Sequence, residues 1–248
     1  MLGQDIAELA ANWVSVVLVS DPFSGVDPRR IHAFDVCLPF NQHYVVDLSL
    51  ASPSPHHRRE ARRSRRFVDI AQAGDKLSLA DDWVRLYQSL IRNKGVTTAA
   101  AFPDECLRKQ LLLSDCRAYV AYYDGEVCAM ALWLIDGDVA YYHLAASATQ
   151  GYKVAASYGL MDAALEDLAT QGIERISLGG APAGGRRNAA GLAYFKSGWA
   201  TDHVPTYVCG KILDSSAYRR LSVRRARQRP TTDDFFPAYR RSSDRYHE

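Results

Sequence analysis

Two segments of the chain hold side chains of the types that transfer protons or stabilise negative charge. His143 lies near the end of the apolar segment 139–145, and Tyr194 and Lys196 share the segment 191–199. An imidazole accepts a proton near neutral pH, and a phenol is able to relay one. Each residue also has a structural alternative. These are a hydrogen-bonded core histidine, a core aromatic ring, and a lysine that complements the negative end of a helix.

Catalysis through a covalent nucleophile is not expected. The chain has no GxSxG motif, and its cysteines have no obvious histidine partner. The five cysteines lack a CxxC pair, so neither a disulfide framework nor a zinc site is predicted. We expect them to be reduced packing residues, and we expect no metal. They are Cys37, Cys106, Cys116, Cys128 and Cys209.

Composition indicates an ordinary soluble globular protein of 248 residues, with 48% hydrophobic and 23% charged residues. No apolar stretch approaches the roughly 20 residues that cross a bilayer, and the N-terminal residues lack a basic region followed by an apolar one, so we expect a cytoplasmic protein. The net charge is only +2, but positive charge gathers in two blocks, at 56–66 and 219–229. Each block is either a solvated helix face or a contact with a polyanion, and two such blocks favour a polyanionic partner.

Apolar periodicity and turn residues predict the elements of the first half of the chain. The segment 13–19 is β-branched and apolar, which favours a buried strand. Ser54 and Pro55 open a short basic helix. Further strands are expected at 44–48 and 66–71. Two further helices are expected at 79–93, where Gly95 stops the helix, and at 102–113, where Pro103 and Asp104 begin it.

The second half predicts a three-stranded meander and a crossover. Asp124-Gly125 is typical of a hairpin with a type I′ turn, and Asp136-Gly137 predicts a second hairpin turn of the same kind. The strands of this meander are expected at 118–123, 126–135 and 139–145. Behind them we expect a helix at 154–170, a strand at 173–178, a short helix at 189–197 and a strand at 206–213. This order predicts an α+β fold with a β-α-β crossover.

The order of elements and the segment 192–199 resemble the GNAT superfamily of acyltransferases. The late helix of that family carries a tyrosine before a Gly-aromatic pair, and Tyr194 is the matching residue. In relatives that use acyl-coenzyme A, this tyrosine lies near the leaving sulfur. Those relatives also bind the pyrophosphate with a (Gln/Arg)-x-x-Gly-x-(Gly/Ala) loop. The corresponding stretch here, residues 147–153, keeps a single glycine, Gly151.

A second resemblance is to the Fem-type branch, which transfers amino acids from aminoacyl-tRNA. It is carried by YVVDLS at 44–49 with the His-His-Arg-Arg helix, by YFKSGW at 194–199 and by FFPAYR at 235–240. The resemblance implies a GNAT fold, with a mixed, mostly antiparallel central sheet flanked by helices. It also implies three regions. These are a partial N-terminal GNAT-like lobe with the basic helix (1–70), an acyltransferase core (71–214) and a basic C-terminal tail (215–248).

The resemblance further assigns roles to single residues. Lys196 matches the lysine of the Fem-type Phe-Lys-x-Gly-aromatic pattern and would stabilise the oxyanion or pair with a phosphate, with Tyr194 and His143 as the other catalytic residues. Substrate contacts are expected from Tyr141, Tyr142, Phe195 and Trp199. RNA or phosphate contacts are expected from Arg58, Arg59, Arg62, Arg63, Arg186, Arg187 and Gly151.

Three functions remain open at the level of the sequence. The leading one is an aminoacyl-tRNA-dependent transferase that forms an amide on a small-molecule or peptide amine, in natural-product biosynthesis for example, with charged tRNA as co-substrate and no cofactor. The second is an N-acyltransferase that uses acetyl-CoA or another acyl-CoA. The third is a GNAT-like module that binds RNA without catalysis. The weak coenzyme A loop and the basic blocks favour the first.

Overall fold

The computed structural model describes residues 2–96, 100–181, 189–226 and 236–240. The chain forms two compact units, the larger from residues 43–203 and the smaller from residues 1–42 and 204–248. The strands β2 (Val36–Asp47) and β8 (Asp202–Ile212) contribute residues to both units. The basic helix, expected in the N-terminal region, lies in the larger unit. The three-part division at residues 70 and 214 stays a prediction.

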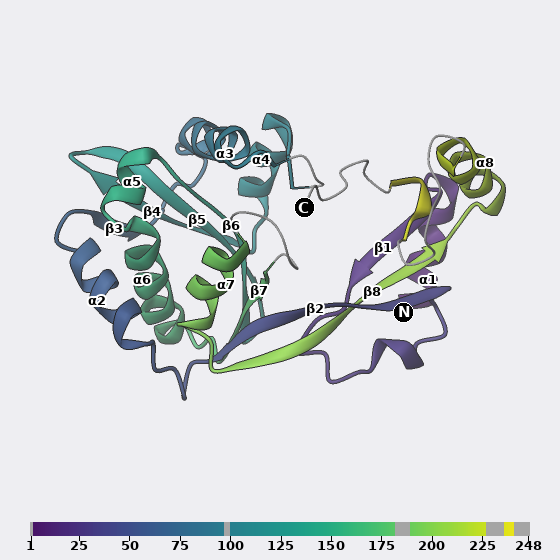
Figure 1. Ribbon diagram of the computed structural model, residues 1–248, viewed down its shortest axis with the longest axis horizontal. Helices are drawn as coiled ribbons and strands as arrows, with labels where there is room; N and C mark the ends of the chain where they lie inside the picture. Colours follow the sequence, from purple (N-terminus) through teal and green to yellow (C-terminus); the bar gives the residue numbers. More distant parts are fainter. Residues whose placement is uncertain (1, 97–99, 182–188, 227–235, 241–248) are drawn as a thin grey trace. The chain divides into compact units, whose positions relative to one another are not determined.

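The larger unit is built on a mixed sheet (Figure 1). Its strands stand in the order β2-β7-β6-β5-β4-β3. Neighbouring strands are antiparallel except β6 and β7, which are parallel, so the predicted meander and crossover are confirmed. The strands of the larger unit besides β2 are β3 (Asp69–Gln72), β4 (Cys116–Tyr123), β5 (Glu126–Asp136), β6 (Val139–Ser147) and β7 (Arg175–Gly180).

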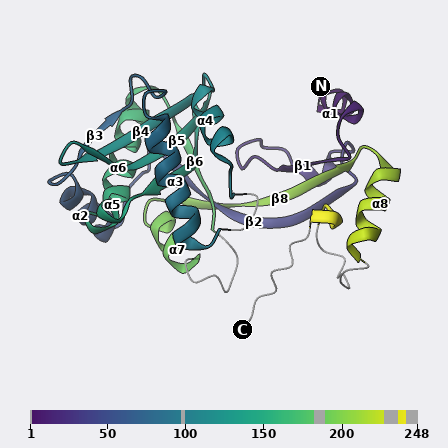
Figure 2. The same cartoon turned by 90° about the horizontal axis from the view of Figure 1, so that it is seen from above.

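Helices cover both faces of this sheet (Figures 1 and 2). One buried cluster joins α2, α6 and α7 to the sheet, and a second cluster joins α3 and α4 to the opposite face. Of the helices that the structure describes, none is both long and apolar enough to span a bilayer. The helices of the larger unit are α2 (Pro55–Ser64), α3 (Ala80–Lys94), α4 (Asp104–Leu112), α5 (Thr149–Lys153), α6 (Ala156–Thr170) and α7 (Ala189–Ser197).

Turn chemistry explains several of these boundaries. Asp124 and Gly125 have φ angles of 50° and 79°, which confirms the type I′ turn between β4 and β5. The second turn differs from the prediction. Asp136 pairs with Val139, so its central residues are Gly137 and Asp138, and only Gly137 has positive φ, at 59°. That pattern is typical of a type II′ turn.

The smaller unit holds β1 (Ser15–Val19), which pairs with β8, and the first part of β2. The strand predicted at residues 13–19 is confirmed as β1, but its predicted burial is wrong, because β1 is an edge strand with Val17 and Val19 41% and 45% exposed. Its remaining elements are α1 (Leu2–Glu8), η1 (Leu9–Ala11), η2 (Pro28–Arg30), α8 (Ser215–Ala226) and η3 (Ala238–Arg240).

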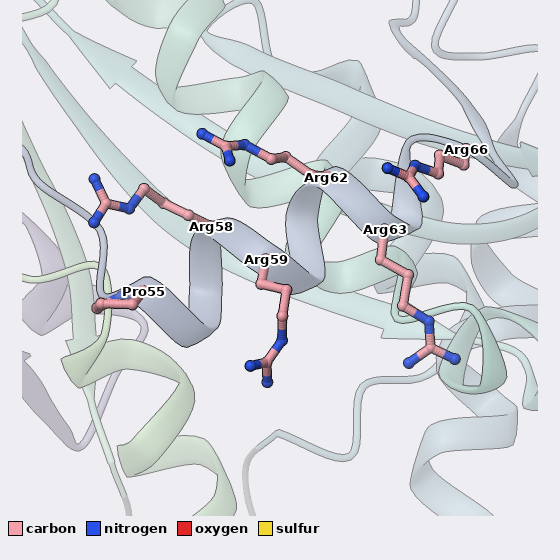
Figure 3. Close-up of a pocket in the computed structure, with 6 residues that line it drawn as sticks. All are labelled: Pro55, Arg58, Arg59, Arg62, Arg63 and Arg66. Atoms are coloured by element: carbon pink, nitrogen blue, oxygen red, sulfur yellow. The ribbon is translucent and has the colours of Figure 1, made fainter.

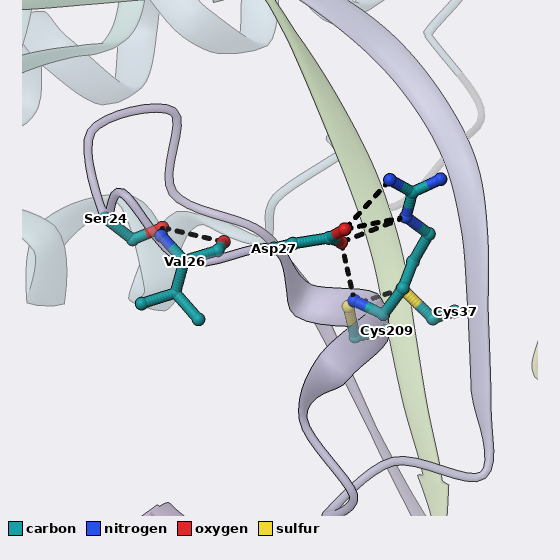
Figure 4. A network of polar contacts seen from close by, with 6 residues as sticks. Ser24, Val26, Asp27, Cys37 and Cys209 are labelled. Atoms are coloured by element: carbon teal, nitrogen blue, oxygen red, sulfur yellow. Dashed lines mark hydrogen bonds and ion pairs between the residues drawn. The ribbon is translucent and has the colours of Figure 1, made fainter.

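Two polar contacts in the smaller unit are shown in Figure 4. The carboxylate of Asp27 accepts from the backbone N–H of Arg29, at 3.0 Å, and from its guanidinium. The thiols of Cys37 and Cys209 lie 3.5 Å apart, and burial, with the contact to Cys37, raises the pKa of Cys209 to about 12. The neutral thiol is therefore the stable form of Cys209 at neutral pH.

Candidate active site

The parallel strands β6 and β7 are paired only over their first residues. The pairing runs from Val139 opposite Arg175 to Tyr141 opposite Ser177, whereas β6 continues to Ser147 and β7 to Gly180. Both strands carry an irregularity just beyond the last pair. These irregularities lie towards the carboxyl ends of β6 and β7, which is where ligands bind in many sheets with parallel strands.

On β6 the irregularity is a bulge at His143. Leu132 and Trp133 of β5 are opposite Leu144 and Tyr142, so His143 is the additional residue. Bulges of this kind redirect a side chain and are frequent beside active sites. His143 is half-buried, and its burial lowers its pKa below the ordinary value of 6.5. At neutral pH the imidazole is therefore uncharged and able to accept a proton.

On β7 the irregularity lies at Leu178 and Gly179. Val45 pairs with Ser177 and Tyr44 with Gly179, which leaves Leu178 as the additional residue, and Gly179 has a φ of 71°. The backbone N–H of Gly179 donates to the hydroxyl of Ser177 at 3.3 Å. Beyond the bulge, the carbonyl oxygen of Gly180 accepts a hydrogen bond from α7.

Lys196 of α7 is buried over this end of β7. Its ammonium donates to the carbonyl oxygen of Gly180 at 2.6 Å, and a Cβ at Gly179 would lie 3.5 Å from Nζ. The residue is 7% exposed, and desolvation lowers the pKa of the ammonium to about 8. Most of the ammonium is still protonated at pH 7, and a pKa this close to neutrality suits either charge stabilisation or proton transfer.

Ser177 and His43 are neighbours in this region that the sequence analysis missed. Nδ1 of His43 lies 3.4 Å from the hydroxyl of Ser177, which is itself buried. The two residues are 134 positions apart in the chain, and no spacing rule links them. Only the pairing of β2 with β7 brings them together.

The structure separates two of the predicted catalytic residues. Tyr194 and Lys196 are two positions apart on α7, and residues at this spacing point to different sides of a helix. The Tyr194 side lies against α2, with ring centroids 5.6 Å from His56 and 5.4 Å from His57. Tyr194 is 54% exposed, whereas Lys196 is buried.

Three of the predicted substrate contacts lie in or against the core. Trp199 is 1% exposed, and Phe195 packs against the same cluster with its ring 5.1 Å from that of Tyr158. Tyr142 packs 4.9 Å from Trp133, and burial raises its pKa. Tyr141 closes the parallel pairing, opposite Ser177. Substrate contact by any of these residues stays a prediction.

The basic helix α2 is docked onto the end of α7 by His57. Its Nε2 donates to the carbonyl oxygen of Phe195 at 3.0 Å, and the hydroxyl of Ser54 donates to Nδ1 at 2.7 Å. Burial lowers the pKa of His57, in agreement with a neutral ring that donates at one nitrogen and accepts at the other. The backbone N–H of Ser54 also donates to the carbonyl of Gly198 at 2.8 Å.

The outer side of α2 forms a groove lined by arginines, which we call the arginine groove (Figure 3). It encloses about 700 Å³ and is lined by Pro55, Arg58, Arg59, Arg62, Arg63 and Arg66. Figure 3 shows Arg58 and Arg62 along one side of the helix, with Arg66 just beyond the end of the helix, and Arg59 and Arg63 along the other side. Arg59 and Arg63 each lie 3.4 Å from Glu60. Within the described ranges, no ion pair joins Arg58, Arg62 or Arg66, which we call the unpaired arginine row, to an acidic side chain. The predicted phosphate ligands Arg186 and Arg187 lie outside the described residues.

Gly151 has a packing role. It is buried in the five-residue helix α5, and a Cβ at this position would lie 2.4 Å from the carbonyl oxygen of Cys128 on β5. Only glycine lets α5 approach the backbone of β5 this closely. Packing alone therefore explains why this residue is glycine, and phosphate binding by Gly151 stays a prediction. Among the residues described, no His, Cys, Asp or Glu cluster is arranged to hold a metal ion.

The sequence matches one protein-family profile, and the fold described above agrees with it. The family profile described as "Acetyltransferase (GNAT) domain" matches residues 55–197, more than half of the chain. The chain therefore belongs to the GNAT family and is an acyltransferase. Searches of curated protein sequences give no match.

Solved structures extend the likeness to the Fem-type fold. FemX superposes with a TM-score of 0.58 at 11% identity, covering 88% of this chain and 69% of FemX. The C-terminal domain of a candidate lysylphosphatidylglycerol synthetase from Agrobacterium fabrum gives 0.56 at 18% identity, over 77% of this chain and 65% of that domain. L-PGS from Bacillus licheniformis gives a TM-score of 0.51 at 16% identity, over 77% of this chain and 66% of L-PGS. The chain thus spans about two-thirds of the length of these proteins. The predicted Fem-type resemblance is confirmed at the level of the fold.

Proposed function

We propose that this acyltransferase takes an amino acid from aminoacyl-tRNA and joins it to the amine of a small-molecule or peptide acceptor. The observation that carries the proposal is the docking of α2 on α7. His57 ties the helix that lines the arginine groove to the helix that holds Lys196 over Gly180. A surface suited to a polyanion and a buried cation thus belong to one packed assembly. The Fem-type fold supports the same donor.

The reaction requires few groups, because an aminoacyl ester is already activated. The amine nitrogen attacks the ester carbonyl carbon, and the carbonyl oxygen becomes an oxyanion beside the ammonium of Lys196. His143 accepts the proton that the amine nitrogen loses. The bond to the ribose oxygen then breaks, and that oxygen takes up a proton as it leaves. The new bond is an amide, and no oxidant, metal or covalent enzyme intermediate is involved.

An acyl-CoA donor is the second candidate, and the description of the matching family as an acetyltransferase favours it. Against it stands the packing role of Gly151, the one glycine kept from the pyrophosphate-binding loop. With an acyl-CoA donor, the amine would attack the thioester carbonyl and the thiolate of coenzyme A would leave.

Mass spectrometry of products distinguishes the two donors. The purified protein is incubated with a panel of amines, once with total charged tRNA and once with acetyl-CoA, and Lys196→Met serves as the inactive reference. We expect amides of amino acids in the first incubation alone. Acetylated amines with acetyl-CoA, and no product from charged tRNA, would refute the aminoacyl-tRNA proposal.

A further inference from the structure

Three aromatic rings form a partly exposed surface at the start of α2 that the proposed reaction does not use. We call His56, Tyr158 and Tyr194 the aromatic surface. His56 lies 5.6 Å from Tyr194 and 5.9 Å from Tyr158, measured between ring centroids. Tyr194 is 54% exposed and the other two are half-buried. The ring of Tyr194 lies on the side of α7 away from Lys196.

The aromatic surface is continuous with the arginine groove. The guanidinium of Arg59, which lines the groove, lies 3.0 Å from Nδ1 of His56. A guanidinium has only donors, so Nδ1 of His56 accepts this hydrogen bond. One helix, α2, thus carries both the aromatic ring and the cations. A ligand with a flat ring next to a chain of anionic groups would contact both at once.

The arrangement of the charges favours a linear polyanion. Arg58 and Arg62 are four residues apart, which places their side chains about 6 Å apart along α2, and Arg66 follows just beyond the end of the helix. A helix that binds a membrane surface needs an exposed apolar face. The less polar side of α2 is already buried, with His57, Ala61 and Ser64 packed inward.

We propose that the aromatic surface stacks an unpaired base of a single-stranded nucleic acid whose phosphates lie in the arginine groove. The inference rests on the proposed function, since it describes how the RNA of the donor would be held. Aromatic side chains beside a basic groove bind single strands in this way, because every base offers a flat face. Tyr194 acts through its ring in this proposal, and its hydroxyl transfers no proton.

Fluorescence anisotropy with matched ligands tests the stacking. The probes are a single-stranded RNA of about ten nucleotides and a ribose-phosphate chain of the same length without bases. We expect the full chain to bind the RNA about tenfold more tightly than the abasic chain, the order expected for one stacked base. Tyr194→Phe should keep this preference, and Tyr194→Leu should reduce it to twofold or less. The matched control is Tyr152→Leu, at an exposed tyrosine of α5 that lies beside Lys94.

Two results with these probes would overturn the inference. One is equal affinity of the wild type for both probes. The other is an unchanged preference in Tyr194→Leu. Binding to vesicles of anionic phospholipid that depends on Tyr194, without such dependence for RNA, would likewise assign the surface to a membrane.

Turnover separates this inference from the proposed function. A protein that prefers the base-bearing probe through Tyr194 but forms no product from charged tRNA retains the stacking site and refutes the donor. A protein that uses charged tRNA but shows no base preference supports the proposed donor and refutes the stacking site. If Tyr194→Phe abolished turnover with RNA affinity unchanged, the hydroxyl would be a proton relay, which would refute the statement that it transfers no proton and would leave the stacking of the ring supported.

Discussion

The ring of His57 packs so closely against Gly198 that no larger residue fits at position 198. A Cβ built on Gly198 would lie 2.0 Å from Cε1 of the His57 ring. The ring is 1% exposed and is enclosed by Trp199, Tyr158 and Phe195. The glycine of the Gly-aromatic pair is therefore explained by the docking of α2, and the contact is open to test by substitution.

Gly198→Ala should destabilise the protein by about 1–3 kcal/mol, because the added methyl overfills a packed site. Gly191→Ala is the matched control, since its Cβ would meet nothing within 4 Å. In a His57→Ala background, the cost of Gly198→Ala should fall below 1 kcal/mol or so, because the clashing ring is gone. Urea unfolding of the four proteins measures this. Equal costs in both backgrounds would show that the clash lies elsewhere.

Lys196→Met should change how stability depends on pH. The pKa of Lys196 is about 8 in the folded chain and near the ordinary 10.5 when unfolded. Between these values the unfolded chain holds the proton that the folded chain has lost, so the free energy of unfolding of the wild type rises with pH. Relative to Lys196→Met, the rise from pH 8 to 10.5 should be up to about 3 kcal/mol. Lys153→Met, at an exposed lysine, should match the wild type. A wild-type curve parallel to that of Lys196→Met would contradict the burial of the charge.

His143→Gln should lower kcat/KM by about 10²- to 10⁴-fold, the range for loss of a general base. In the wild type, kcat/KM should fall with decreasing pH on a limb below pH 6.5, because burial lowers the pKa of His143 and only the neutral ring accepts a proton. The variant should lack that limb. His32→Gln, at an exposed histidine, should retain it. Persistence of the limb in His143→Gln would assign the base to another group.

Removal of the unpaired arginine row should weaken the binding of RNA and its dependence on salt. Replacement of Arg58, Arg62 and Arg66 together by glutamine should reduce the slope of log K against log salt by about 2, at roughly 0.7 for each phosphate contact on a single strand. Arg65→Gln is the control, since Arg65 lies 2.9 Å from Asp162 and 2.7 Å from Glu166. An unchanged slope in the triple variant would place the phosphates elsewhere.

Gly151→Ala should destabilise the protein by about 1–3 kcal/mol without changing the affinity of the folded protein for its donor. The added Cβ would press on the backbone carbonyl of Cys128, which cannot swing aside as the end of a flexible side chain can. Gly74→Ala, with nothing within 4 Å, should be neutral. Thermal unfolding and donor titration measure the two effects. A selective loss of coenzyme A affinity at unchanged stability would support the acyl-CoA alternative instead.

Local signals in the sequence were sufficient for most elements of the larger unit. The Asp124-Gly125 turn, the Gly95 stop and the Ser54 cap each depend on residues within one or two turns of chain. β2 was harder to foresee. Only 44–48 has the pattern of a strand, while Pro39 and Asn41 interrupt the part before it. The long strand exists because β7 and β8 supply its partners, which no local pattern reveals.

The candidate site was only partly predictable for the same reason. Residue type and family resemblance identified Lys196 and His143, but the burial of Lys196 and the bulge at His143 arise from packing between distant segments. His57 was visible only as part of a basic block, although its side chain faces inward. Tyr194 was identified for its hydroxyl, whereas the feature that the structure exposes is its ring.

Tyr194 and Lys196 lie on different sides of the nine-residue helix α7, so one short helix carries both the exposed ring proposed to stack a base and the buried ammonium proposed to stabilise the oxyanion. A substitution that disturbs the packing of the whole helix should therefore change RNA binding and turnover together, whereas a substitution confined to one side should change only one of them.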